Sequence, residues 1–114
     1  MKDVDKKFNY KGKEYRLAFN LNVMEEIQDE YETLDKWGSL TDGSSGEVNA
    51  KAVIFGFTAM LNEGIEMDNE DNGTDIKPFT HKQVGRLLTE IGLDSMTQQL
   101  NEVVVESTKS VEKN

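Results

Sequence analysis

The side chains whose type and spacing come closest to a chemical site are the acids and amides of residues 68–75. Asp68, Glu70 and Asn72 match the first, third and fifth positions of an EF-hand loop, which binds calcium through oxygen ligands. The twelfth position of such a loop is a bidentate glutamate, and this chain has Phe79 there. The pattern therefore favours a solvated acidic loop over a calcium site.

The chain has a single histidine, His81, as a further candidate for chemistry. A general base or an activated nucleophile needs a second group oriented beside it, and the residues around His81 supply none at a suitable spacing. No nucleophile elbow, Walker A loop, dinucleotide fingerprint or zinc-protease motif is present either. The sequence therefore predicts that the protein is not an enzyme and uses no cofactor or metal.

The composition of the chain narrows the classes of function and of binding partner that remain. A chain of 114 residues is expected to form one domain, 1–114. Its net charge of -9 argues against binding to nucleic acid or to an anionic membrane. No apolar run approaches the roughly 20 residues of a membrane span, and the lack of cysteine fits a reducing cytoplasm. A basic partner, or an apolar partner with a basic rim, is the best match.

The elements that would position a binding surface begin with a β-hairpin over residues 8–19. Apolar and polar residues alternate there with the period of two that is typical of half-buried strands. A turn at Lys11–Gly12 pairs Phe8 with Tyr15, because glycine accepts the positive φ of a tight turn. This register places four apolar side chains on one face: Phe8, Tyr10, Tyr15 and Leu17.

Two helices and a connector are expected next. Asn22 is the expected N-cap of an acidic amphipathic helix, whose buried stripe continues to Leu34. Residues 34–47 are rich in Gly, Ser and Asp, which indicates a connector. Residues 48–62 form a helix that is apolar on most sides, as expected of a helix that is central in its fold or half-covered by a partner.

The second half of the chain is expected to hold an acidic loop and two more helices. Residues 63–78 form the loop, Thr80 and Gln83 form a capping box, and Gly92 ends that helix. Ser95 begins the last helix. The predicted fold class is α+β: an N-terminal β-hairpin packed against a bundle of about four α-helices, with mobile termini and a mobile acidic loop.

Two aromatic residues are candidates for partner contact. Trp37 lies in the polar connector, and Phe55 lies on a second apolar face of its helix. Aromatic residues in such places are enriched at binding hot spots. The same positions are equally compatible with a place in the core.

The chain resembles the tail assembly chaperones of long, non-contractile-tailed phages and prophages of Gram-positive bacteria. The hairpin segment Tyr10–Phe19, followed by the acidic helix with Met24–Ile27, is similar to the opening of that family. Residues 54–64 are similar to its central helix, and residues 80–93 to its next, threonine-capped helix. The resemblance covers residues 8–106.

This resemblance implies a non-enzymatic role in the cytoplasm of a bacterial host. The protein would bind the tape-measure protein and keep its apolar helical segments soluble while tail-tube subunits polymerise around it. It would then be absent from the mature virion. The apolar positions left unassigned to the core suggest a groove lined by Phe55, Ala59 and Val105.

Two other classes of function fit the sequence. A head–tail connector or tail-completion protein would remain in the particle, and an acidic DNA mimic would inhibit a host nuclease or DNA-binding protein. The sequence also leaves open whether the protein is a homo-oligomer in which hairpins of two copies pair edge to edge.

Overall fold

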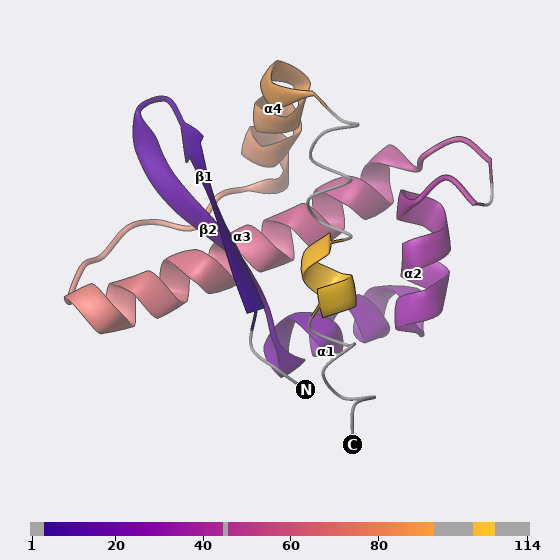
Figure 1. The fold of residues 1–114 in the computed structure, drawn as a ribbon, viewed down its shortest axis with the longest axis horizontal. Helices are drawn as coiled ribbons and strands as arrows, with labels where there is room; N and C mark the ends of the chain where they lie inside the picture. Colours follow the sequence, from indigo (N-terminus) through magenta and orange to yellow (C-terminus); the bar gives the residue numbers. More distant parts are fainter. Residues whose placement is uncertain (1–3, 45, 93–101, 107–114) are drawn as a thin grey trace.

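The computed structural model shows a hairpin followed by helices (Figure 1). The residues that it describes are 4–44, 46–92 and 102–106. In chain order the elements are strands β1 (Val4–Tyr10) and β2 (Lys13–Phe19), helices α1 (Leu21–Tyr31), α2 (Leu34–Thr41), α3 (Ala50–Asn72) and α4 (His81–Ile91), and a helical turn at 102–106. The fold class is α+β, with an N-terminal hairpin packed against about four helices, as predicted.

The hairpin has the predicted register. Strands β1 and β2 are antiparallel, and Phe8 lies opposite Tyr15. Lys11 and Gly12 both have positive φ, 52° and 76°. Positive φ at both central residues is typical of the type I′ turn, whose twist matches that of the flanking strands. The two-residue turn therefore fixes the register.

Helix α3 is the central element and crosses the hairpin in Figure 1. Its buried residues lie all around the helix between Ala52 and Ile65, which confirms that it is central. Phe57 packs edge-on against Phe8 of the hairpin, with ring centroids 5.7 Å apart. Burying one such large apolar side chain stabilises the fold by about 1.5–3 kcal/mol. The contact between α3 and the hairpin therefore contributes much of the stability of the core.

Two glycines allow close packing around α3. A Cβ atom at Gly64 would lie 2.1 Å from the carbonyl oxygen of Arg16 in β2, and one at Gly56 would lie 2.2 Å from Cζ2 of Trp37. Real Cβ atoms do not approach other atoms so closely. The helix therefore contacts the backbone of β2 directly at Gly64 and the indole ring at Gly56.

Helix α1 begins earlier than predicted. Its N-cap is Asn20 rather than Asn22, and the Asn20 side chain accepts hydrogen bonds from the backbone N–H groups of Asn22 and Val23 at 3.1 and 3.3 Å. Asn20 has the extended backbone conformation of an N-cap because it directly follows β2. The strand thus leads into the helix without a connecting loop.

The prediction of a connector over residues 34–47 was wrong in its first half, because residues 34–41 form α2. The Thr33 side chain caps α2 by accepting a hydrogen bond from the Lys36 N–H at 3.0 Å. A helix of this length is marginal by itself, and Trp37 anchors it by burying its indole ring in the core. This tertiary contact outweighs the weak helix propensity of Gly38 and the neighbouring serine.

The prediction of an acidic loop over residues 63–78 was also wrong in part. Helix α3 continues to Asn72, and only the following residues form an extended segment that leads to α4. Gly73 ends the helix in the left-handed conformation, with φ 65°, as is common at helix C-termini. The acidic residues up to Asp71 therefore lie on a helix.

The beginning of α4 was predicted correctly. The Thr80 hydroxyl accepts a hydrogen bond from the Gln83 N–H at 3.1 Å, and the Gln83 side chain accepts one from the Thr80 N–H at 2.8 Å. These reciprocal bonds form the expected capping box. The helix ends at Gly92, as expected. The predicted helix start at Ser95 lies outside the described residues.

Candidate partner-binding groove

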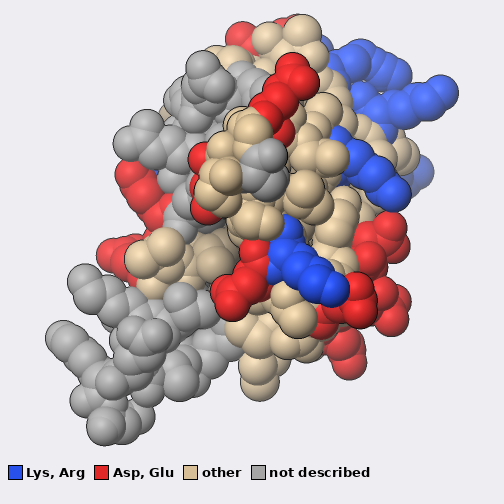
Figure 2. Space-filling view, turned by 90° about the vertical axis from the view of Figure 1, so that its right-hand side faces the viewer, with Lys and Arg blue, Asp and Glu red and all other residues tan. Residues whose placement is uncertain are grey.

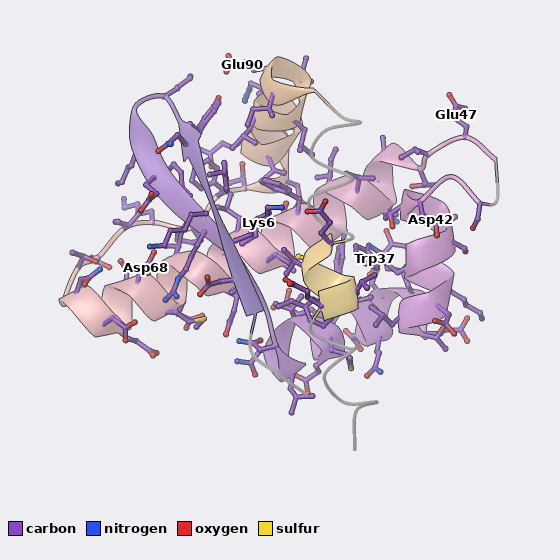
Figure 3. All side chains as sticks on the ribbon, viewed as in Figure 1. Lys6, Trp37, Asp42, Glu47, Asp68 and Glu90 are labelled. Carbon is purple, nitrogen blue, oxygen red and sulfur yellow. The ribbon has the colours of Figure 1, made fainter. Side chains whose placement is uncertain are left out.

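Two of the predicted partner-binding residues lie in the core. Trp37 is 1% exposed and Ala59 is 7% exposed. The Trp37 Nε1–H donates a hydrogen bond to the Ala52 carbonyl oxygen at 2.9 Å, so both its ring and its polar group are satisfied inside the protein (Figure 3). Ala59 lies on a face of α3 that the fold covers. Neither side chain is available to a partner in this structure.

The other two predicted residues are accessible but differ in surroundings. Phe55 is half-buried between the rings of Tyr31 and His81, with centroid distances of 5.5 and 6.0 Å. Val105, in the turn at 102–106, is 58% exposed. Ala59 is therefore too buried to line the predicted groove between Phe55 and Val105. Phe55 belongs to a small aromatic cluster that joins α1, α3 and α4.

A different hollow lies between the tip of the hairpin and α4, with a volume of about 260 Å³. We call it the tip groove. Its walls come from the end of β1, from the turn, from the segment before α4 and from α4 itself. The lining residues are Tyr10, Lys11, Phe79, Gln83, Arg86 and Glu90.

Aromatic rings and cations lie close together in the tip groove and beside it. Phe79 packs edge-on against Tyr15, with centroids 5.4 Å apart. The Lys11 ammonium lies 5.4 Å from the centroid of the Tyr10 ring, and the Lys13 ammonium lies 5.7 Å from that of Tyr15. Rings present an apolar surface and the flanking cations attract carboxylates. The groove therefore suits an apolar side chain with acidic neighbours.

The position of Phe79 is fixed by α3. The Phe79 N–H donates a hydrogen bond to Asn62 Oδ1 at 2.8 Å, and Asn62 Nδ2 donates one to the Phe79 carbonyl oxygen at 3.0 Å. One amide side chain thus satisfies both backbone groups of a segment that has no regular structure. The floor of the tip groove is therefore attached to the most buried helix of the fold.

Charge is unevenly distributed over the molecule. The hairpin, 4–19, carries five basic and two acidic residues, whereas α1 carries four acidic residues and no basic one. On the face drawn in Figure 2, most basic side chains gather along one edge. The protein is acidic as a whole, yet its hairpin is basic. A partner with separate acidic and basic regions would match this pattern.

The acidic side of the molecule centres on α1. A shallow hollow there is lined by Glu25, Glu26, Gln28 and Asp29. Partial burial raises the pKa of Glu26, and the negative charges of Glu63, Glu25 and Glu66 raise it further. Carboxylates from α1 and α3 therefore repel one another along this side, which would attract a cationic surface.

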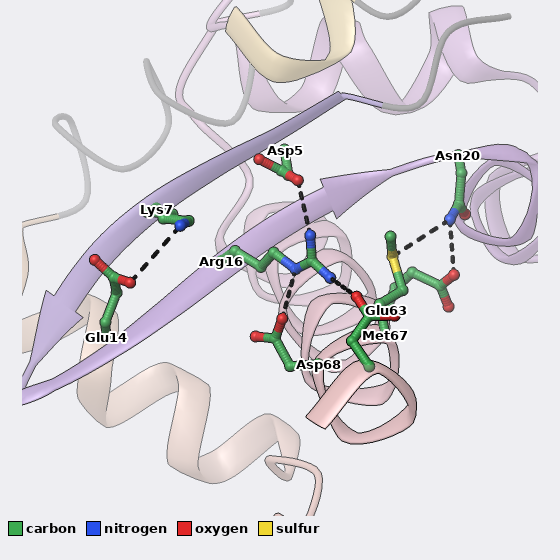
Figure 4. A network of polar contacts seen from close by, with 9 residues as sticks. Asp5, Lys7, Glu14, Arg16, Asn20, Glu63, Met67 and Asp68 are labelled. Carbon is green, nitrogen blue, oxygen red and sulfur yellow. Dashed lines mark hydrogen bonds and ion pairs between the residues drawn. The ribbon is translucent and has the colours of Figure 1, made fainter. Parts of the chain in front are cut away.

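A half-buried arginine, Arg16, joins the hairpin to the end of α3 (Figure 4). The side chain of Arg16 is 14% exposed, and its guanidinium meets Asp5, Asp68 and Asp71 at 2.9, 3.0 and 3.6 Å. Two of these acids lie in the segment that was compared with an EF-hand loop. These two aspartates lie on α3 and neutralise Arg16 of β2, so their role in the structure is to hold α3 against β2.

The described residues hold no group of three or more His, Asp or Glu side chains arranged to bind a metal ion. Among the described helices, none combines the length and apolar character needed to cross a bilayer. Comparisons with protein-family models, with curated proteins and with solved structures found no match. What the fold and the groove define is a small α+β domain with an aromatic, cation-rimmed hollow.

Sequence reasoning missed the tip groove because its parts are far apart in the chain. The lysines and tyrosines around the turn are visible in the sequence, but their neighbours Phe79 and Arg86 come from the other half of the protein. The usable signal was the concentration of basic residues in the hairpin of an otherwise acidic chain.

Proposed function

We propose that this protein is a non-enzymatic tail assembly chaperone that binds the tape-measure protein of a phage or prophage in the host cytoplasm. The resemblance over residues 8–106 supports this function. The structural observation that supports it further is the tip groove, which is lined by half-buried aromatic rings with a lysine and an arginine beside them. Such a surface is suited to binding a protein segment.

The chemistry of the groove fits the needs of such a partner. A tape-measure protein exposes long amphipathic helices before the tail tube encloses them, and their apolar stripes favour aggregation. Rings of Tyr10 and Phe79 would cover apolar side chains of one such stripe, and Lys11 and Arg86 would pair with its acidic neighbours. The acidic surface of α1 would keep the complex soluble.

An acidic DNA mimic is a second candidate, favoured by one observation. Glu26 lies close enough to Glu63, Glu25 and Glu66 for their charges to raise its pKa, so carboxylates gather on the α1 side as phosphates do on DNA. The basic hairpin of the same molecule is less compatible with this function, because it would repel a DNA-binding protein.

Co-expression with the tape-measure protein tests the proposal. We expect that protein to be soluble, and to co-purify, only when this chain is present. Lys11→Glu and Arg86→Glu should reduce the co-purified amount at least several-fold, because each places a carboxylate on the rim of the tip groove. Lys51→Glu makes the same charge change on α3, away from the groove, and should bind normally.

Two outcomes would contradict the proposal in different ways. An insoluble tape-measure protein that never co-purifies, at several salt concentrations, would exclude the chaperone function. A soluble complex that the three variants form equally well would retain the function but exclude the tip groove as its site. Salt-sensitive capture of a basic DNA-binding protein, lost in Glu25→Lys, would favour the DNA mimic.

A further inference from the structure

Each strand of the hairpin has one outer edge, and among the described elements a helix covers only that of β2. Helix α3 covers β2, because Gly64 touches the Arg16 carbonyl oxygen and the residues from Leu17 to Phe19 are fully buried. In β1, Asp5, Lys7 and Asn9 are exposed, while the residues between them are half-buried. The hairpin therefore has one covered edge and one strand with an exposed row of side chains.

The turn determines which backbone groups of β1 point outward. In a two-residue hairpin the residues that flank the turn, here Tyr10 and Lys13, form a hydrogen-bonded pair, and such pairs alternate along the strands. The register then leaves the N–H and C=O groups of Asp5, Lys7 and Asn9 directed away from β2. Among the described residues, no backbone hydrogen bond outside the hairpin reaches these three.

We infer that β1 is a pairing edge for a second copy of this chain, with β1 and its copy antiparallel about a two-fold axis at Lys6. The two hairpins then form a four-stranded sheet, which is more stable in water than an isolated two-stranded one. An unpaired strand edge is a template for another strand. Because the interface is isologous, the strand has to be complementary to itself.

The charges of β1 meet this condition in one register. With the axis at Lys6, Asp5 of each copy lies opposite Lys7 of the other, which gives two pairs of opposite charge. With the axis at Lys7, Asp5 of each copy would lie opposite Asn9 of the other, and no pair of opposite charge would form across the axis. Asp5 and Lys7 lie on the side of the hairpin that also carries Arg16 and Glu14 (Figure 4), so the new pairs would extend an existing row of ion pairs.

The turn at 102–106 adds an apolar contact beside the same axis. Lys6 forms an ion pair with Glu102 at 2.5 Å, which neutralises the lysine nearest the axis. Val105 lies on the same face of its helical turn as Glu102, because residues three apart are neighbours on a helix. It is 58% exposed. Pairing of two copies would bring their Val105 side chains together and cover them.

The absence of cysteine from the chain makes a direct test possible. Under mild oxidation, Lys6→Cys should form a disulfide-linked dimer, because residues at the axis of an antiparallel pair have Cα atoms about 4.5–5.5 Å apart, within the range of a disulfide. Lys13→Cys, on β2, is the matched control and should link only at the slow rate of random collisions. The protein alone is used, so the result is independent of the proposed function.

Sedimentation of the purified protein tests the same inference without a covalent bond. We expect a concentration-dependent dimer, weakened about tenfold by Lys7→Glu, which turns two attractive cross-strand pairs into repulsive ones. Lys13→Glu makes the same charge change on β2 and should leave the dimer unchanged. Circular dichroism would establish that both variants are folded.

The inference fails if the protein stays monomeric up to about millimolar concentration and Lys6→Cys links no faster than Lys13→Cys. A dimer that Lys7→Glu and Lys13→Glu weaken equally would place the contact elsewhere and would also overturn it. Rapid linking of Lys7→Cys in place of Lys6→Cys would overturn the proposed register and its charge pairs.

Discussion

Helix α3 is held in two different ways along its length. From Ala52 to Ile65 it is buried and is fixed by apolar contacts and by the close approach at Gly64. From there to Asn72 it extends past the core and is fixed by polar contacts, chiefly from Arg16. The contacts of the first half depend little on salt and pH, because they are apolar and exclude water. The second half depends on ion pairs and amides, whose strength varies with salt and pH.

A substitution at Gly64 is expected to destabilise the buried half of α3 more than any other change proposed here. Gly64→Ala places a Cβ atom 2.1 Å from the Arg16 carbonyl oxygen, and neither backbone can yield without separating α3 from β2. We expect a loss of about 3 kcal/mol in the free energy of unfolding, at the upper end for overpacked sites. Denaturant unfolding followed by circular dichroism measures it.

Gly85→Ala is the matched control in α4. Its Cβ would lie 3.7 Å from the nearest atom, Cδ1 of Ile54, which is an ordinary contact. Because alanine favours a helix by about 1 kcal/mol over glycine, this variant should be as stable as the parent or more so. Equal losses in both variants would show that Gly64 is not a point of close contact.

The extended half is broken at Arg16. Arg16→Met keeps much of the side-chain volume and removes the charge that Asp5, Asp68 and Asp71 share. We expect a loss of about 1–2 kcal/mol at low salt, since hydrogen bonds to charged groups are worth more than neutral ones but all three acids are at least 38% exposed. The loss should shrink in 1 M salt.

Arg86→Met controls for the general loss of a cation, because Arg86 is exposed on α4. Its effect on unfolding should stay within about 0.5 kcal/mol, as for most surface changes. If the two arginine variants lose the same stability with the same dependence on salt, the ion pairs of Arg16 contribute nothing specific to the end of α3.

A smaller effect is expected at Asn69, which connects the end of α3 to the segment that follows. Its side chain accepts hydrogen bonds from the Ile76 N–H and the Thr74 hydroxyl and donates one to the Ile76 carbonyl oxygen, at 3.0, 2.8 and 2.9 Å. Asn69→Ala should cost about 1 kcal/mol and increase hydrogen exchange at the Ile76 amide. Asn72→Ala, at the exposed end of the helix, should do neither.

The elements that the sequence could predict are those whose stabilising contacts are local or follow from a clear apolar pattern. The hairpin register and the start of α4 depend on local chemistry: a Lys11–Gly12 turn, and a capping box between Thr80 and Gln83. Both were predicted correctly. The buried part of α3 was also predicted, because a helix that is apolar on most sides belongs at the centre of a fold.

The remaining elements depend on partners that are distant in the chain. The end of α3 was predicted as a loop because it is rich in Asp and Asn, which have modest helix propensity. Arg16, which neutralises two of its aspartates, lies about fifty residues earlier. Helix α2 was missed because it requires Trp37 to pack on Gly56. The tip groove likewise combines both halves of the chain.

The smallest expected effect lies where the two halves of α3 meet. Glu26 of α1 faces Glu63 and Glu66 there, and burial together with these charges raises its pKa above the ordinary value of 4.5. A carboxyl whose pKa is higher in the folded state than in the unfolded state destabilises the fold when it is ionised. This penalty is present at pH 7 and disappears as the pH falls through the folded pKa and then below 4.5.

Glu26→Gln should therefore raise the melting temperature slightly at pH 7, and the gain should vanish near pH 4, where the parent carboxyl is protonated in both states. Glu70→Gln, at the exposed end of α3, makes the same change in net charge and should give no such pH-dependent difference. Thermal unfolding of the three proteins between pH 4 and pH 7 measures this. A gain for Glu26→Gln that is independent of pH would mean that packing, rather than charge repulsion, limits stability where α1 meets α3.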